Sequence, residues 1–189
     1  MLTSLTLSMS CTPLLKTLST PILTHFALEF PTYGSASSAD IRSFLRKFAT
    51  SLTRLKLSGS PLKEQELIDL FKTLPLLTEL QLVHGSWDGM ENIFSEVLFN
   101  GLHSSWSSVL PQLQTLSITG DLSLSWESLI DLLESRCPEY GNDATCGPLR
   151  SVQLHLYTPF EVETKTRFEA LTKRGMHVDV FELMTWVAN

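Results

Sequence analysis

The chain has 189 residues, of which 43% are hydrophobic, so it is long enough to bury a sizeable core as one domain. Its net charge of −6 argues against binding nucleic acid or an anionic membrane, and no apolar run approaches the roughly 18 residues of a membrane span. Three cysteines, Cys11, Cys137 and Cys146, are too few and too scattered for a disulfide framework. The amino terminus lacks the basic and continuously apolar regions of a signal peptide, so we expect a cytoplasmic or nuclear protein.

One six-residue pattern, Leu-x-x-Leu-x-Leu or a close variant, recurs along the chain. The copies begin at Leu2, Leu23, Leu52, Leu77, Leu113 and Leu149, and a shortened seventh copy covers residues 176–180. The shorter intervals between copies fall in or near the usual span of leucine-rich repeats, and the longer ones contain loops rich in Ser, Gly and Pro at 101–109 and 138–148. Because a potential helix follows each full copy, the pattern predicts a solenoid whose units bury their apolar faces against their neighbours.

Within each copy, inward and outward side chains alternate with the period of a strand that has one buried face. The residues expected to point inward are Leu5, Leu7, Phe26, Leu28, Leu55, Leu57, Leu80, Leu82, Leu116, Ile118, Val152, Leu154, Val178 and Val180. The residues between them are expected to point to the opposite, concave face. Strands stacked in this way predict a parallel inner sheet of about six to seven strands.

The segments between the strands change to helical spacing, with hydrophobic residues three and four positions apart. The expected stripes are Ile41, Phe44, Leu45 and Phe48; Leu67, Leu70, Phe71 and Leu74; Met90, Ile93, Phe94, Val97 and Leu98; and Leu129, Leu132 and Leu133. Ser37 and Asp40 are placed like a capping box before the first stripe, and Ser125 opens the fourth. These helices would cover the outer side of the sheet.

A fifth outer helix has the clearest start and stop signals. Thr-Pro-Phe-Glu at 158–161 fits an N-cap and first helical turn, and Gly175 fits a C-cap. Glu163 and Arg167 lie four residues apart, which is the spacing of an ion pair on one helix face. The predicted fold class is therefore an α/β leucine-rich-repeat solenoid, with a parallel inner sheet and outer helices.

We expect one leucine-rich-repeat domain over residues 1–189. Terminal repeats normally carry a polar cap, because an uncovered end exposes both the core and a strand edge. The first predicted strand begins at Leu2 with nothing before it, whereas a strand and the tail 182–189 could close the other end. The chain is therefore expected to be the C-terminal part of a longer array.

These residues resemble the leucine-rich-repeat portion of fungal F-box proteins. The similarity includes the Leu-Pro-x-Leu-x-x-Leu-x-Leu joints at 74–82 and 110–118, the segment 126–136 and the ending at 175–180. In that family an N-terminal F-box binds the adaptor of a cullin-type ubiquitin ligase, and the repeats recruit a substrate. The resemblance therefore implies a protein partner that is a ubiquitination substrate. The sequence contains no F-box, so contact with a ligase adaptor is expected only if an F-box lies upstream.

No arrangement of residues in the sequence predicts catalysis, a cofactor or a metal site. The histidines, at positions 25, 84, 103, 155 and 177, include no pair with a recognised ligand spacing, and no Cys-x-x-Cys, nucleophile elbow or phosphate-binding loop occurs. His155 and His177, with Asp179 nearby, form the one cluster worth checking; surface histidines are the favoured interpretation. An intracellular enzyme is the disfavoured alternative.

Two other residue types have both a structural and a functional interpretation. Cys137 and Cys146 flank a loop; they would be either a disulfide, which needs an oxidising compartment, or a buried small hydrophobe and a loop thiol. Trp87, Trp106 and Trp126 occur near loop-to-helix junctions, where packing over the helices is more common than a role in an interface. The structural interpretation is favoured for both.

The outward strand positions carry the candidate binding site. Opposite charges and long polar side chains meet there, and the candidate residues are Glu29, Arg54, Lys56, Glu79, Gln81, Gln153 and His155. Such a surface either keeps the protein soluble or selects a partner through charge complementarity. We expect a non-catalytic protein–protein interaction module, with substrate recognition for a ubiquitin ligase as the first hypothesis. The alternative is a scaffold resembling ribonuclease-inhibitor repeats, with no link to a ligase.

Overall fold

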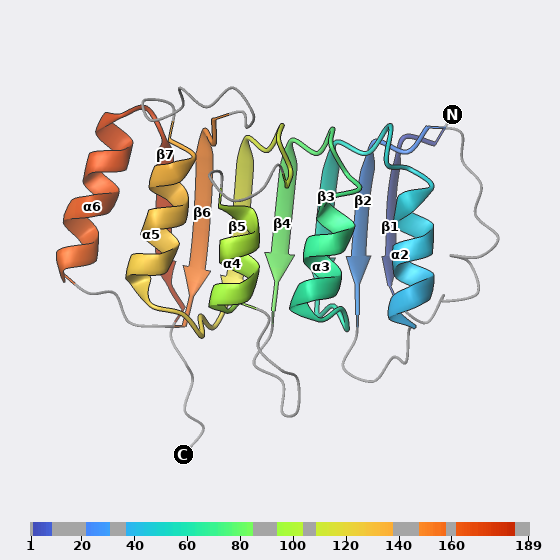
Figure 1. Ribbon diagram of the computed structural model, residues 1–189, viewed down its shortest axis with the longest axis horizontal. Helices are drawn as coiled ribbons and strands as arrows, with labels where there is room; N and C mark the ends of the chain where they lie inside the picture. Colours follow the sequence, from blue (N-terminus) through green and yellow to red (C-terminus); the bar gives the residue numbers. More distant parts are fainter. Residues whose placement is uncertain are drawn as a thin grey trace, which may run out of the picture.

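The strands form one open, parallel sheet. The computed structural model describes residues 2–8, 22–30, 37–84, 94–103, 109–137, 148–157 and 162–183. Within these residues the strands are β1 (Ser4–Ser8), β2 (His25–Glu29), β3 (Arg54–Ser58), β4 (Glu79–Val83), β5 (Thr115–Gly120), β6 (Ser151–Leu156) and β7 (His177–Glu182). Each strand pairs with the next one along the chain, so the spatial order is the chain order (Figure 1).

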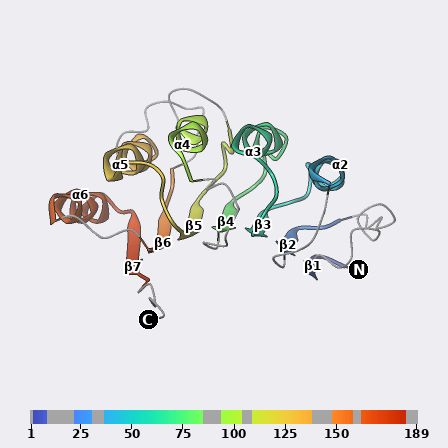
Figure 2. The same cartoon turned by 90° about the horizontal axis from the view of Figure 1, so that it is seen from below.

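A layer of helices covers one face of the sheet. The described helices are α2 (Ser38–Arg46), α3 (Glu64–Phe71), α4 (Glu96–Leu102), α5 (Trp126–Ser135) and α6 (Val162–Lys173). Figure 2 shows the strands along the inner side of an arc and the helices along its outer side. The predicted α/β solenoid with a parallel inner sheet and outer helices is thus confirmed, and the inner side of the arc is the concave face.

The predicted inward residues form two rows across the sheet, because the register aligns every strand with the next. In β2 to β6 these side chains are almost completely buried. Those of β1 and β7 are partly buried, since these strands lie at the two edges of the sheet. The predicted alternation is therefore correct for all seven strands.

The hydrophobic residues of α2 are buried as predicted, but its predicted capping box is incomplete. Ile41, Phe44 and Leu45 of α2 are buried, and so is Phe48 in the turn that follows. Ser37 is the N-cap residue, as expected, but its side chain makes no capping hydrogen bond, so that half of the predicted capping box is absent. The packing of the stripe therefore positions this helix.

Glu66 joins α2 to α3. Its carboxylate accepts hydrogen bonds from the Ser38 hydroxyl at 3.0 Å and from the Lys63 backbone N–H at 3.2 Å. Its Oε1 also lies 3.2 Å from an Arg42 guanidinium nitrogen. Glu66 thus accepts from a backbone N–H at the start of α3 and also binds two side chains of α2, which fixes the two helices together.

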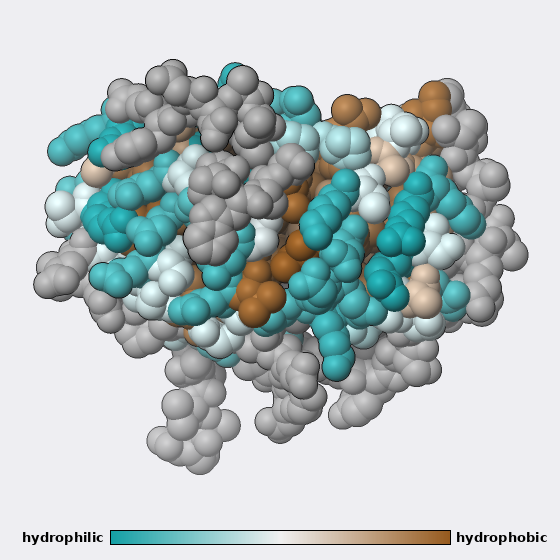
Figure 3. Space-filling model, in the orientation of Figure 1, coloured by the Kyte–Doolittle hydropathy of each residue, from teal (hydrophilic) through white to brown (hydrophobic). Residues whose placement is uncertain are grey.

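The third predicted helix begins later than expected. Ser95 is the N-cap of α4 and accepts a hydrogen bond from the Val97 N–H at 3.2 Å. Phe94 therefore precedes the helix, although it is buried as predicted. Val97 was predicted to be buried but is 51% exposed, because α4 packs against the core through Leu98, Phe99 and Leu102 instead. Figure 3 shows hydrophobic surface near α4 on an otherwise largely hydrophilic helix face. Met90 and Ile93 lie outside the described residues.

The end of α4 contains residues predicted to form a loop. Gly101 and Leu102 belong to the helix. A Cβ on Gly101 would lie 2.7 Å from Cδ1 of Ile68, so glycine lets α4 approach α3 closely at this point. The helix therefore ends in a close contact between two repeats.

The last two helices are joined by aromatic packing. The predicted inward residues of α5 are buried, and Ser125 caps the helix by accepting from the Ser128 N–H at 3.2 Å. The ring of Trp126 meets that of Phe168 on α6 edge to face, with centroids 6.2 Å apart. The structural interpretation of Trp126 is confirmed, whereas Trp87 and Trp106 lie outside the described residues.

Arg167 of α6 pairs with carboxylates of α5. Its Nη2 lies 2.8 Å from Asp131 and 2.9 Å from Glu134, and these hydrogen bonds raise its pKa. The guanidinium thus joins two repeats, and the predicted pair with Glu163 is not tested because the side chain of Glu163 lies outside the described part of the chain. Gly175 has a φ of +92°, which confirms the predicted C-cap, although the predicted start at 158–161 lies outside the described residues.

Arg136 is a buried cation that the sequence did not single out. It is 3% exposed, and it donates hydrogen bonds to the carbonyls of Leu102 at 2.8 Å, Val109 at 2.6 Å and Leu110 at 3.1 Å. Leu110 has a φ of +51°, an uncommon conformation for this residue type. The guanidinium thus holds the end of α4 and a strained turn before β5 at the same time.

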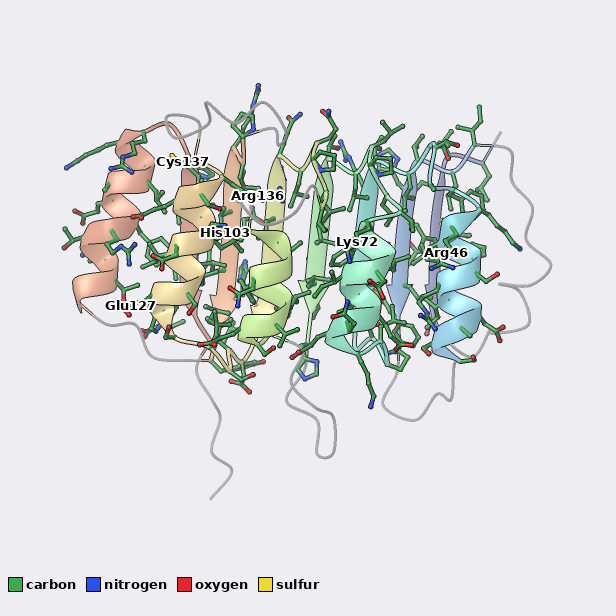
Figure 4. The ribbon with its side chains drawn as sticks, in the orientation of Figure 1. Arg46, Lys72, His103, Glu127, Arg136 and Cys137 are labelled. Carbon is green, nitrogen blue, oxygen red and sulfur yellow. The ribbon has the colours of Figure 1, made fainter. Side chains whose placement is uncertain are left out.

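Figure 4 labels Arg136, Cys137 and His103 toward the same end of α4 and α5. Cys137 is a buried free thiol, as the structural interpretation predicted, while Cys146 lies outside the described residues. Burial is the main cause that lowers the pKa of His103; Asp131 opposes it, and Arg136 adds to it. This end of the helix layer is therefore a structural junction.

A ladder of threonines connects the first four repeats just before their strands. The hydroxyl of Thr24 donates to the carbonyl of Thr3 at 3.0 Å, that of Thr53 to Thr24 at 3.1 Å, and that of Thr78 to Thr53 at 3.0 Å. At Gln114 the side chain differs, but the backbone N–H still donates to the Thr78 carbonyl at 2.9 Å. We call these hydroxyl bonds the threonine ladder.

Removing one hydroxyl from the threonine ladder should have a modest effect. Thr53→Val keeps the side-chain volume but loses the bond to Thr24, so we expect a loss of about 1 kcal/mol in the free energy of unfolding. Thr53→Ser keeps the donor and should recover much of that loss. The measurement is urea denaturation monitored by circular dichroism. Equal stability of the valine and wild-type proteins would show that the ladder contributes nothing measurable.

Candidate functional site

The concave face consists of three rows of side chains that run across the strands. The first row is Ser4, His25, Arg54, Glu79, Thr115, Ser151 and His177; the middle row is Thr6, Ala27, Lys56, Gln81, Ser117, Gln153 and Asp179; the third is Ser8, Glu29, Ser58, Val83, Thr119, His155 and Phe181. Neighbouring strands are about 4.8 Å apart, so residues along a row lie within contact distance of one another. The rows are largely polar, and none of the described helices lies over them (Figure 2).

Two ion pairs cross the central strands. Arg54 lies directly opposite Glu79, and its Nε is 3.2 Å from Oε2 of that residue. Lys56 lies opposite Ala27, so its Nζ reaches diagonally to Glu29, 2.9 Å from Oε1. The four side chains are roughly one-third to three-fifths exposed, and each pair is therefore worth at most about 1 kcal/mol to the fold. Their main effect is to hold four charges in fixed positions on the surface.

A hollow of about 220 Å³ lies beside these charges, over β1 to β4. It is lined by Ser4, Leu5, Thr6, His25, Phe26, Ala27, Arg54, Leu55, Lys56, Glu79 and Gln81. We call it the central hollow. Its middle contains Ala27, whose short side chain stands between the longer Thr6 and Lys56 in the middle row. A small residue at this position leaves space where its neighbours extend outward.

The lining of the central hollow offers both donors and acceptors. Arg54, Lys56 and Gln81 contribute cationic and amide donors, and Glu79 contributes a carboxylate. The imidazole of His25 is oriented by a contact of 2.7 Å between its Nδ1 and the Thr24 hydroxyl. This arrangement suits a partner that carries both charges or several hydrogen-bonding groups.

Five of the seven predicted site residues are brought together here. Four of them line the central hollow, and Glu29 adjoins it through its ion pair with Lys56. The sequence reasoning did not assign a role in the site to Ser4, Thr6, His25 or Ala27. The one signal available was Ala27, a small residue at an outward position between longer ones.

The other two predicted residues, Gln153 and His155, lie elsewhere on the concave face. Both are on β6, and β5 separates them from the hollow. Ser117, which is buried, stands between Gln81 and Gln153 in the middle row. Two strand spacings of about 4.8 Å place Gln153 roughly 10 Å from Gln81. The predicted site is therefore two regions of one face.

The histidine cluster does not converge on one point. His177 Nε2 lies 3.0 Å from Oδ2 of Asp179, whereas His155 is in another row and stacks on Phe181. Across the described residues, no group of three or more His, Cys, Asp or Glu side chains is arranged to hold a metal ion. The cluster therefore offers polar and aromatic surface.

His84 lies beyond the end of β4 and is buried. Its ring meets the edge of Phe94, with centroids 5.9 Å apart, and burial is the main cause that lowers its pKa, opposed by Asp121. A Cβ on Gly120 would lie 2.4 Å from the His84 carbonyl oxygen, so the backbones are in close contact here. These contacts indicate that His84 has a structural role in packing.

None of the helices in the described ranges combines the length and hydrophobicity that crossing a membrane requires. No protein-family model matches the chain, and a comparison with curated proteins finds no match. The fold and the geometry of the concave face are thus the observations that bear on function.

Proposed function

We propose that the chain is a non-catalytic protein–protein interaction module that binds a protein partner on its concave face. The observation that carries this proposal is the central hollow, with Arg54–Glu79 and Lys56–Glu29 held in position around it. Charges on adjacent strands are preorganised, so a partner loses little free energy in ordering them. A partner lying across the strands would contact several repeats at once.

The charged pairs support partner selection more than fold stability. Each pair is partly exposed and contributes little to folding, yet complementary charges steer encounter and exclude partners with like charges. The four charges sum to zero and alternate in sign between neighbouring strands. A matching partner would therefore present charges of both signs at a similar spacing.

The test is a charge swap that leaves the fold intact. Glu29→Lys with Lys56→Glu keeps the ion pair and the net charge but reverses the direction of the pair. We expect the swapped protein to keep its circular dichroism spectrum and unfolding midpoint, and to lose most of its capture of the natural partner. Arg54→Glu with Lys56→Glu should lose capture as well.

The matched control lies on the outer face. Lys165→Glu with Lys173→Glu changes two exposed residues of α6 and should leave capture intact. Arg167 is unsuitable for this purpose because it pairs with α5. Loss of the partner from the α6 variant, with retention by the swapped protein, would move the site to the convex face.

We further propose that the partner is a substrate for ubiquitination, which the resemblance to the repeats of fungal F-box proteins supports. The proposal requires an F-box upstream of this chain, and reading the transcript upstream of Met1 is the direct test. If an F-box is present, the longer product should bind a cullin-ligase adaptor, and this chain alone should not. If none is present, a repeat scaffold without a ligase link becomes the better proposal.

A further inference from the structure

An exposed aromatic stack lies at the β6–β7 end of the concave face. His155 and Phe181 face each other in register, with ring centroids 4.8 Å apart and planes 17° apart. Phe181 is 52% exposed although it is a large hydrophobic residue. One of its ring faces is stacked, so the orientation of the ring is fixed while much of its surface stays open to solvent.

Polar groups flank this stack on the same face. Asp179 precedes Phe181 by two residues and therefore points to the same side of β7, about 7 Å away along the strand. One of its oxygens lies 3.0 Å from His177 Nε2, which limits the rotation of the carboxylate.

The combination of ring and carboxylate selects the charge of an occupant. The face of an aromatic ring attracts a cation, and a neighbouring carboxylate adds to that attraction. An anionic group would be repelled by Asp179. An apolar group would displace water from the carboxylate without replacing its hydrogen bonds. A planar cation suits the site better than a point charge, because the rings are already stacked nearly parallel.

We propose that His155, Phe181 and Asp179 form a subsite for an arginine side chain of the protein partner. The guanidinium stacks as a third plane on the open face of Phe181, at the outer side of β7, and donates a hydrogen bond to Asp179 on the same strand. This inference rests on the proposed function, since the arginine belongs to the protein that the concave face binds. We call these three residues the arginine subsite.

The spacing between the two regions limits the partner segment. The middle row runs from Gln81 on β4 to Asp179 on β7, which is three strand spacings or about 14 Å. An extended chain covers that distance with about four or five residues. One short segment lying across the strands can therefore place an arginine in the subsite and another polar side chain in the central hollow.

Nuclear magnetic resonance titration tests the arginine subsite without the unknown partner. The 189-residue chain, labelled on its His and Phe rings, is titrated with N-acetyl-arginine amide and separately with N-acetyl-citrulline amide, a neutral molecule of the same shape. We expect saturable shifts of the His155 and Phe181 resonances with the arginine compound. The citrulline compound should bind at least about fivefold more weakly than the arginine compound.

Variants identify the groups that carry the binding. Phe181→Leu should abolish the shift of the His155 resonance, and Phe181→Tyr, which keeps the ring, should retain it. Asp179→Asn should weaken binding about threefold to tenfold. The α6 variant with Lys165→Glu and Lys173→Glu should bind as the wild type does.

Three results would overturn the inference: no saturable shift with the arginine compound, equal binding of the two compounds, or unchanged binding by Phe181→Leu. Unfolding midpoints of all variants show whether a loss reflects the fold. The titration is independent of partner capture. Failure of the charge swap to affect capture would reject the central hollow, while a normal titration would still support the arginine subsite.

Discussion

Leu80→Asp is expected to abolish cooperative folding of the domain. Leu80 is completely buried at the centre of the sheet, in the inward row between Leu55 and Leu116. A carboxylate at this position would be surrounded by hydrocarbon and have no ion-pair partner, at a cost of more than about 4 kcal/mol. Domains of this size are typically stable by about 5–15 kcal/mol, so this cost removes much or all of the stability. Thermal unfolding monitored by circular dichroism measures the effect.

The adjacent residue provides the control. Gln81→Asp places the same side chain one position along β4, where it points to the concave face and remains in contact with solvent. We expect its unfolding midpoint to change by only a few degrees, since surface substitutions usually alter stability by about 0.5 kcal/mol or less. Similar losses in the two variants would show that the assigned register of β4 is incorrect.

Arg136→Met is expected to lower the free energy of unfolding by about 3–5 kcal/mol. Methionine keeps much of the aliphatic stem but cannot donate to the carbonyls of Leu102, Val109 and Leu110. These carbonyls would lose charge-assisted bonds, and the strained turn at Leu110 would lose its support. Urea denaturation measures this loss of free energy of unfolding, which is the shift in the midpoint concentration multiplied by the slope of the free energy against urea concentration.

Two further variants make the result specific to the buried guanidinium. Arg150→Met removes an exposed arginine and should change stability by less than about 0.5 kcal/mol. Arg136→Lys keeps the charge but not the planar fork of donors, so its stability should fall between those of the wild type and Arg136→Met. If Arg136→Met were as stable as Arg150→Met, the three hydrogen bonds would not hold this junction.

The strands could be predicted because their signal is repeated. Inward leucines with a period of two, as in Leu55 and Leu57, fix which face is buried, and a slip by one residue would bury Lys56 instead. The helices α2, α3 and α5 were predictable for a similar reason, since their hydrophobic residues recur at three and four positions. Repetition makes each assignment consistent with its neighbours.

The exceptions depend on contacts between residues far apart in sequence. The start of α4 is set by Ser95, whereas the hydrophobic pattern runs on through residues ahead of it and favours an earlier start. Arg136 is indistinguishable from a surface arginine until the fold places three carbonyls around it. The partners of Arg167 on α5 depend on helix packing in the same way.

The candidate site was predictable as a set of residues but not as a shape. The outward positions of Arg54 and Glu79 follow from the strand period, and adjacent strands bring them together. The hollow depends on the absence of side-chain volume at Ala27, which a search for charged residues overlooks. The distance from the hollow to His155 depends on the number of intervening strands, so it required the strand order.

The threonine ladder also determines how such an array changes in length. Each of Thr24 and Thr53 donates to the repeat before it, while its own carbonyl accepts from the repeat after it. These hydrogen bonds are therefore the same on both sides of a repeat, and duplication or deletion of a whole unit within the ladder would recreate them. An array built in this way can vary the reach of its binding surface by gene duplication, while mutations at outward positions alter what that surface recognises.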